Sequence, residues 1–118
     1  MYQRVGGYPF FVELVERFYQ LVEIDPVLRP LYPQDLKPGK AHLSAFLAQY
    51  WGGPHRYSLE RGHPRLRQRH ISFSIGQKER DAWVTQMVSA VNSMEISSNE
   101  ATLMVDYFKS TATLLINR

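Results

Sequence analysis

The stretch PFFVELVERFYQLVEIDP, residues 9–26, has the helical period that decides the fold class. Its apolar residues recur every three or four positions, which places them on one face of an α-helix. These residues are Phe11, Leu14, Val15, Phe18 and Val22. Tyr19 follows Val15 by four residues and is expected at the edge of the buried stripe. The stretch therefore predicts an amphipathic helix that begins near Pro9.

Outward from this helix, turn-forming residues divide the next part of the chain. Asp25-Pro26 is a good N-cap followed by a first-turn proline, and it predicts a short helical piece ending around Tyr32-Pro33. A second long helix is expected to start at Pro38 and to end sharply at Gly52-Gly53-Pro54. Its apolar side is assigned to Ala41, Phe46, Leu47, Tyr50 and Trp51, with Gly39 and Leu43 on an adjoining face.

Two further helices are predicted after a segment without a clean period. That segment, His55 to Ser74, is interpreted as a loop with at most a turn or two of helix at Pro64–His70. A long helix then runs from Gln77 to about Met94, and capping residues 97–100 open a last helix through Leu115. Their inward residues are Ala82 or Trp83, Met87, Ala90, Val91, Met94, Leu103 or Met104, Tyr107 or Phe108, Thr111, Ala112 and Leu115. Residues 1–118 therefore predict one all-α domain with four main helices.

Composition excludes several classes of protein. The 118 residues are 44% hydrophobic and 21% charged, which is ordinary globular usage and not that of a disordered tail. No cysteine is present, so disulfides, thiolate metal sites, cysteine nucleophiles and thiolate-ligated haem are excluded. No apolar run is long enough to cross a bilayer, and no secretory signal is apparent. A cytoplasmic protein that does not insert into membranes is the expectation.

Basic residues concentrate in one segment. Lys and Arg exceed Asp and Glu by 14 to 11, and five arginines between Arg56 and Arg69 accompany one acid, Glu60. This segment is interpreted as a solvated face, a set of phosphate contacts, or partners for the carboxylates of an anionic cofactor. Aromatic residues make up 13% of the chain, which fits either an aromatic core or the lining of a cofactor pocket. Charge and composition leave these alternatives open.

The four histidines predict no metal cluster. His42, His55, His63 and His70 are 13, 8 and 7 residues apart, and no His-Glu-x-x-His pattern or hydrolase motif is present. One imidazole is nevertheless enough for iron when a porphyrin supplies the other ligands. His70 is the best placed, because it ends a basic segment whose arginines could pair with haem propionates, and Ile71 and Phe73 follow it. A surface histidine in a basic loop is the alternative.

Seven blocks in this order and spacing resemble the group II truncated haemoglobins. They are Val5-Gly6-Gly7, Arg17-Phe18-Tyr19, LRPLYP at 28–33, FLAQYWGGP at 46–54, Tyr57-Ser58, GHPRLRQRH at 62–70 and ERDAW at 79–83. Each block alone is weak, but together they span the chain from Val5 to about Asn117. The resemblance implies a globin shortened to a two-over-two helical sandwich that encloses haem b, with its first helix nearly absent.

The resemblance also assigns roles to individual residues. His70 matches the proximal iron ligand, and Tyr19, Tyr32 and Trp83 match distal groups that face the bound ligand. Gly39 occupies a position where other globins have a ligand-gating side chain, and His42 one where the family often has a Lys or Arg that reaches a haem propionate. The cofactor contacts implied are His70, Gly39, His42, Leu43, Phe46, Tyr57, Arg69, Phe73 and Trp83.

These assignments imply a haem protein that binds dioxygen and other diatomic ligands. Donors from Tyr19, Tyr32 and Trp83 would slow ligand release, which suits peroxidase or nitric oxide dioxygenase-like chemistry with an external reductant. Oxygen storage or delivery is the alternative function, and a basic helical nucleic-acid-binding module is a distant one, because Pro64 interrupts the basic segment. The expectation is thus no nucleic-acid or membrane partner, with a homo-oligomer left open.

Overall fold

A computed structural model describes residues 1–55, 57–58 and 74–117 of the chain. All the regular structure of these residues is helical. The elements are α1 (Tyr8–Ile24), the short 3₁₀ helix η1 (Arg29–Leu31), α2 (Lys37–Tyr50), α5 (Gln77–Asn92) and α6 (Ser98–Leu114). The described residues contain no strand. The predicted all-α class is confirmed, and the bounds of the four long helices differ from the predicted ones by one or two residues, whereas η1 begins three residues after Pro26. Residues 57 and 58, inside the predicted loop, are helical.

Helix α1 buries the predicted stripe completely. Phe11, Leu14, Val15, Phe18 and Val22 are all buried. Tyr19, predicted at the edge of this stripe, is also buried, with only 4% of its surface exposed. The reason is that α1 contacts both α2 and α5, which widens its covered face beyond one narrow stripe.

The predicted turn signals act at the ends of the helices. Asp25 accepts hydrogen bonds from the backbone N–H groups of Val27 and Leu28, at 2.8 and 3.1 Å, and so caps the turn that leads to η1. After α2, Gly52 has a φ of 99°, a left-handed conformation that glycine adopts without strain. Ser97 accepts from Glu100 N–H at 3.2 Å at the start of α6. The chain therefore turns where local chemistry predicts.

The buried face of α2 differs from the predicted one. Ala41 is exposed and Tyr50 is 53% exposed, whereas the buried residues are Ser44, Ala45, Leu47 and Ala48. Three of these four side chains are small, and small side chains let two packed helices approach each other closely. Phe46 and Leu43 are half-buried on another side of the helix. Hydrophobicity alone did not separate the two apolar sides.

The C-terminal helices resolve two of the three alternatives that the sequence left open: Met104 and Phe108 are buried, whereas Ala82 and Trp83 are both half-buried. In α5 the buried residues include Met87, Ala90 and Val91 as predicted, and Val84, which was not predicted. In α6 the chain buries Met104, Phe108 and Ala112, while Leu103 is 54% exposed.

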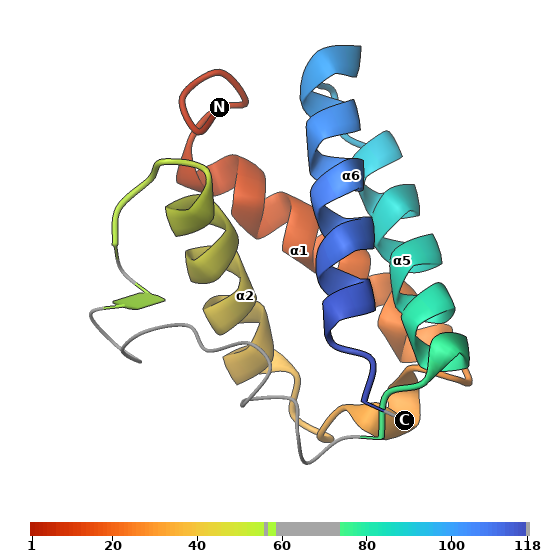
Figure 1. The fold of residues 1–118 in the computed structure, drawn as a ribbon. Coiled ribbons are helices and arrows are strands. Elements are labelled where there is room, and N and C mark those ends of the chain that lie inside the picture. The colour runs from red at the N-terminus through yellow and green to blue at the C-terminus, as the bar shows by residue number, and fades with distance from the viewer. Residues whose placement is uncertain (56, 59–73, 118) are drawn as a thin grey trace.

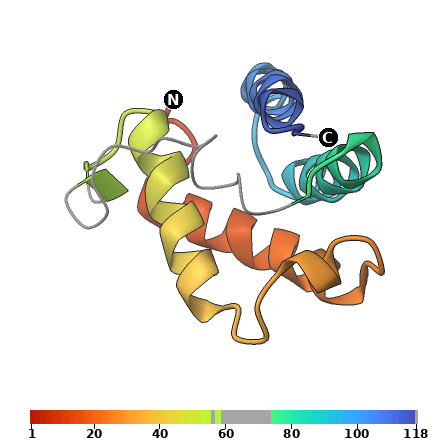
Figure 2. The same ribbon diagram turned by 60° about the horizontal axis from the view of Figure 1, so that its bottom comes forward.

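The helices form two pairs, the arrangement expected of a two-over-two sandwich. Helix α1 packs against α2, α5 packs against α6, and the contact between α1 and α5 joins the pairs. Figures 1 and 2 show α5 and α6 side by side, with α1 crossing behind α2. Within the described residues, none of the helices combines the length and apolar character needed to cross a bilayer.

Candidate functional site

A cavity of about 400 Å³ lies among α1, η1, α2, α5 and α6. Its volume is within the range of small-molecule and cofactor sites, roughly 300–1,000 Å³. Eight residues expected at the site from the sequence line it: Tyr19, Tyr32, Gly39, His42, Leu43, Phe46, Tyr57 and Trp83. The fold therefore gathers into one cavity residues that are up to 64 positions apart in the sequence (83 minus 19).

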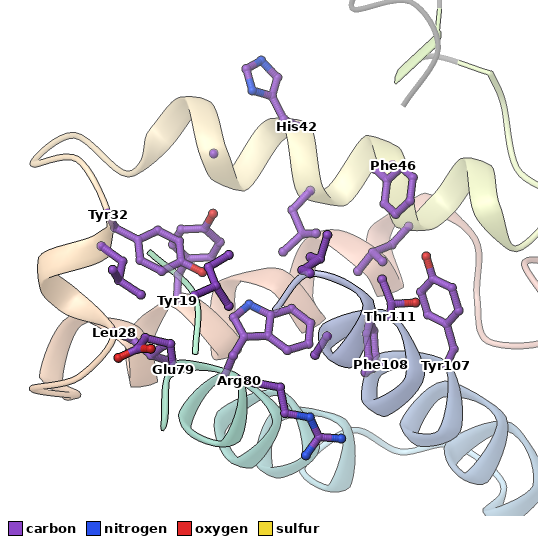
Figure 3. A pocket seen from close by; sticks show the side chains of 18 of the residues that line it. Tyr19, Leu28, Tyr32, His42, Phe46, Glu79, Arg80, Tyr107, Phe108 and Thr111 are labelled. Carbon is purple, nitrogen blue, oxygen red and sulfur yellow. The ribbon is translucent and has the colours of Figure 1, made fainter. Parts of the chain in front are cut away.

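Two of the three side chains that the resemblance assigns to a bound ligand, Tyr19 and Tyr32, lie together at one end of the cavity. The rings of Tyr19 and Tyr32 meet edge to face with centroids 5.6 Å apart. Figure 3 shows these two rings together, with Tyr107, Phe108 and Thr111 at the opposite end. Trp83 makes a side-chain hydrogen bond with Tyr32. The cavity thus has a phenol pair at one end, and the Trp83 ring extends from that pair to Phe108.

Burial keeps both phenols protonated. It raises the pKa of Tyr19 to about 12, because a phenolate loses its hydration there. Burial also raises the pKa of Tyr32, the neighbouring Tyr19 raises it further, and the hydrogen bond with Trp83 opposes that rise. A hydrogen bond that lowers a phenol pKa is one donated to its oxygen, and the indole N–H can only donate. Trp83 therefore donates to the Tyr32 hydroxyl, whose own O–H remains available as a donor.

The turn that carries Tyr32 is held by a single arginine. Arg29 donates to the backbone carbonyls of Tyr32, Pro33 and Gln34 at 3.4, 3.0 and 3.2 Å. A planar guanidinium with five donors is suited to bind several carbonyls at once. The guanidinium thereby fixes the backbone from which the Tyr32 phenol enters the cavity.

Helix α2 supplies the wall that includes Gly39, His42, Leu43 and Phe46. Phe46 meets the ring of Tyr57 edge to face at 5.4 Å, which joins α2 to the chain beyond it. In Figure 3 the His42 imidazole points away from Tyr19 and Tyr32. The structure therefore does not bring His42 to the phenol hydroxyls, and its contact with a propionate remains a prediction.

The sequence did not identify the wall formed by α6. Tyr107, Phe108, Thr111, Ala112 and Leu115 all line the cavity. The helical period placed an inward residue at either Tyr107 or Phe108, but both line the cavity. Phe108 is buried, and the centroid of its ring lies 5.7 Å from that of Trp83. The remaining lining residues are Leu28, Leu31, Pro33, Leu47, Ile75, Glu79 and Arg80.

Three predicted site residues, Arg69, His70 and Phe73, lie outside the described residues. Tyr57 and Ile75, which precede and follow that part of the chain, both line the cavity. Among residues 1–55, 57–58 and 74–117, no three His, Asp or Glu side chains lie together as a metal site. The assignment of His70 to iron therefore stays a prediction.

The described lining fits haem. A porphyrin needs an apolar slot, and leucine and aromatic side chains from η1, α2 and α6 provide it. A diatomic ligand on one porphyrin face needs hydrogen-bond donors in a dry environment, and the buried phenols provide these. The hydroxyl groups of Tyr19 and Tyr32 lie together at one end of this lining, and those of Tyr107 and Thr111 lie at the opposite end.

Comparison with known proteins places this geometry among haem proteins. The model of the bacterial-like globin family matches residues 1–117. Group 2 truncated haemoglobin YjbI of Bacillus subtilis is 34% identical over 117 residues, covering 99% of this chain and 88% of the relative. The haemoglobin of the thermophilic phototroph Chloroflexus aurantiacus has a TM-score of 0.97 and 48% identity, covering 99% of this chain and 97% of that one. A truncated oxygen-avid haemoglobin from Bacillus subtilis has a TM-score of 0.93 and 34% identity, covering 98% of both chains.

Proposed function

Because this chain belongs to the bacterial-like globin family, and within it to the group II truncated haemoglobins, we propose that it binds haem b and uses it for redox chemistry on diatomic ligands. Binding of oxygen or similar ligands at haem is the function that the family supports. The proposal adds the proximal ligand, His70, and the substrates, nitric oxide or peroxide. Electrons come from an external reductant.

When bound, haem supplies an iron centre that holds a diatomic ligand and exchanges electrons with it. The chain's own contribution is the donor end of the cavity. The O–H groups of Tyr19 and Tyr32 are protonated at neutral pH, as any tyrosine is, and burial raises the pKa of both so that they stay protonated in alkaline solution as well. Each can donate to a ligand that carries partial negative charge, at about 1.5–3 kcal/mol for a charge-assisted bond. The surrounding apolar wall excludes water that would compete for these donors.

The observation that carries the proposal is the pair of protonated phenols at one end of an apolar cavity. Two such donors together contribute about 3–6 kcal/mol, and 1.4 kcal/mol corresponds to a factor of ten in rate. Oxygen release would then be slower by several orders of magnitude than from a cavity without donors. Slow release hinders delivery of oxygen, but it allows time for a second reactant to meet the bound ligand. The donor set therefore favours redox chemistry over transport.

The visible spectrum of the purified protein tests haem binding. We expect a Soret band that is lost in His70→Gly and returns when imidazole is added, because free imidazole can replace the missing ring. A Soret band that persists in His70→Gly would contradict the proximal assignment. No band at all, even after haem is supplied, would contradict the proposal as a whole.

Kinetics separate redox chemistry from oxygen storage. Oxygen dissociation and nitric oxide or peroxide consumption should be measured on the same preparation, with a chemical reductant present. Slow oxygen release together with sustained consumption supports the redox function. Rapid release without consumption would instead identify an oxygen carrier.

A further inference from the structure

Gly39 lies against the hydroxyl group of Tyr19. A β-carbon at position 39 would be 2.7 Å from the Tyr19 hydroxyl oxygen, closer than such atoms approach one another in proteins. The next atoms of the ring, Cζ and Cε2, would be at 3.5 and 3.8 Å, which is ordinary van der Waals contact. The hydroxyl oxygen of Tyr19 therefore occupies space that any side chain at position 39 would need.

The Tyr19 ring has little freedom to move away. Only 4% of its surface is exposed, and it contacts the Phe18 ring at 5.5 Å and the Tyr32 ring at 5.6 Å, both edge to face. Tyrosine has only two rotatable side-chain bonds, so it cannot fold around an obstacle as a long side chain can. A collision with its oxygen must shift the whole ring or the helix that carries Gly39.

The first turn of α2 is also fixed at this point. Lys40, the residue after Gly39, pairs with Glu16 on α1 at 3.1 Å, and its ammonium lies 6.0 Å from the centre of the Tyr19 ring. Leu36, immediately before α2, is buried. These contacts hold the start of α2 against α1 on both sides of Gly39. The helix cannot retreat without losing them.

We propose that Gly39 is a positioning residue: its missing side chain sets where the Tyr19 hydroxyl points, and so sets how strongly that hydroxyl binds a ligand in the cavity. This rests on the proposed function in one respect, that the ligand is held opposite the phenols. The steric coupling between positions 39 and 19 does not depend on haem. The size of the residue at position 39 thereby becomes a determinant of ligand release that acts through Tyr19.

A double-mutant cycle tests the proposal with four proteins: wild type, Gly39→Ala, Tyr19→Phe and the double variant. Tyr19→Phe is the matched control, because it removes only the atom that a β-carbon would strike. Denaturant unfolding of each protein as purified measures the coupling. We expect Gly39→Ala to lower the unfolding midpoint in the Tyr19 background, and to leave it unchanged or raise it in the Tyr19→Phe background, since alanine favours helix more than glycine does. Equal shifts in both backgrounds would overturn the coupling.

Ligand spectroscopy and kinetics then test the effect on the hydroxyl itself. In the carbon monoxide adduct, we expect Gly39→Ala to move the C–O stretching frequency towards that of Tyr19→Phe, and the double variant to match Tyr19→Phe. Oxygen dissociation should accelerate at least about tenfold in Gly39→Ala, which is the effect expected when one hydrogen-bond donor is lost. The same substitution should change the dissociation rate little in a protein that already carries Tyr19→Phe. A C–O frequency and a dissociation rate that Gly39→Ala leaves at wild-type values would overturn the proposal. Failure to bind haem would instead contradict the proposed function and leave the unfolding result to decide the coupling.

Discussion

Replacing Trp83 by phenylalanine removes the indole N–H from the cavity while keeping an aromatic ring in its place. The Trp83 ring packs edge to face between Phe18 and Phe108, with centroids 5.3 and 5.7 Å apart, and phenylalanine can keep both contacts. What is lost is the hydrogen bond to the Tyr32 hydroxyl. The substitution therefore separates the indole's packing from its role as a donor.

The magnitude depends on what the indole does once a ligand is bound. If the N–H keeps Tyr32 oriented, its loss costs an ordinary hydrogen bond, about 0.5–1.5 kcal/mol, or roughly twofold to tenfold in rate. If it also donates to the ligand, a charge-assisted bond of about 1.5–3 kcal/mol is lost, or roughly tenfold to a hundredfold. Both Tyr32 and the ligand lie at the same end of the cavity in our proposal. We therefore expect oxygen release to accelerate at least about tenfold.

Stopped-flow displacement of oxygen by carbon monoxide measures this rate. Trp51→Phe is a matched control, because Trp51 packs against Phe11 and Phe108 but does not line the cavity. Its oxygen release should remain at the wild-type rate. In a Tyr32→Phe background the effect of Trp83→Phe should shrink, since part of it acts through the Tyr32 hydroxyl. An unchanged rate in Trp83→Phe, or an equal acceleration in Trp51→Phe, would refute the reasoning.

Three further predictions concern the framework around the cavity. A hydrogen bond from Gln86 is the main cause that lowers the pKa of Asp25. The contribution of the Asp25 carboxylate to stability is therefore present above the unfolded-state pKa of about 3.9 and is lost as the pH falls through the lower folded value. Acid unfolding, followed by circular dichroism, should be less steep in Asp25→Asn. Arg29→Met removes the hydrogen bonds to three backbone carbonyls in the turn after η1. It should destabilise the fold by about 1 kcal/mol and speed oxygen release. An unchanged rate of oxygen release would show that the turn holds its shape without the guanidinium. Met104→Ala should lower the free energy of unfolding, measured with denaturant, by about 2–5 kcal/mol because Met104 is fully buried. Leu103→Ala should change it by no more than about 0.5 kcal/mol because Leu103 is exposed. Similar values for the two variants would contradict the observed buried face of α6.

Helix positions were predictable because local chemistry determines them. Asp25 and Ser97 act through hydrogen bonds to backbone groups two or three residues away, and the conformation of Gly52 is a property of that residue alone. Such signals do not depend on the rest of the fold. The bounds of α1, α2, α5 and α6 therefore agree with the sequence to within a residue or two.

Which side of a helix faces the core was less predictable, because two different environments demand apolar residues. On α2, Ala45 and Ala48 are buried, while Leu43 and Phe46 line the cavity. A hydrophobic pattern assigns the larger residues to the core and overlooks the alanines, although close helix contact favours small side chains. Likewise, the α6 wall depends on how α6 lies over the other helices, which is a long-range property. The cavity residues found from the sequence came from the family resemblance, not from periodicity.

The location of Tyr19 shows why a functional donor lies next to the core stripe and not on it. Phe18 occupies the stripe and fixes the helix against its neighbours, with none of its surface exposed. The adjacent position, about 100° around the helix, is still buried, but it faces the cavity. Burial there raises the pKa of the phenol to about 12, so that the hydroxyl keeps its proton, and it also removes the water that would compete for that proton. A phenol at the surface would also be protonated at neutral pH, but water would compete for its hydrogen bond. A donor of this kind therefore requires a helix whose buried face extends beyond the stripe that packs in the core. Helix α1 has such a face, because α2 and α5 cover it from two sides.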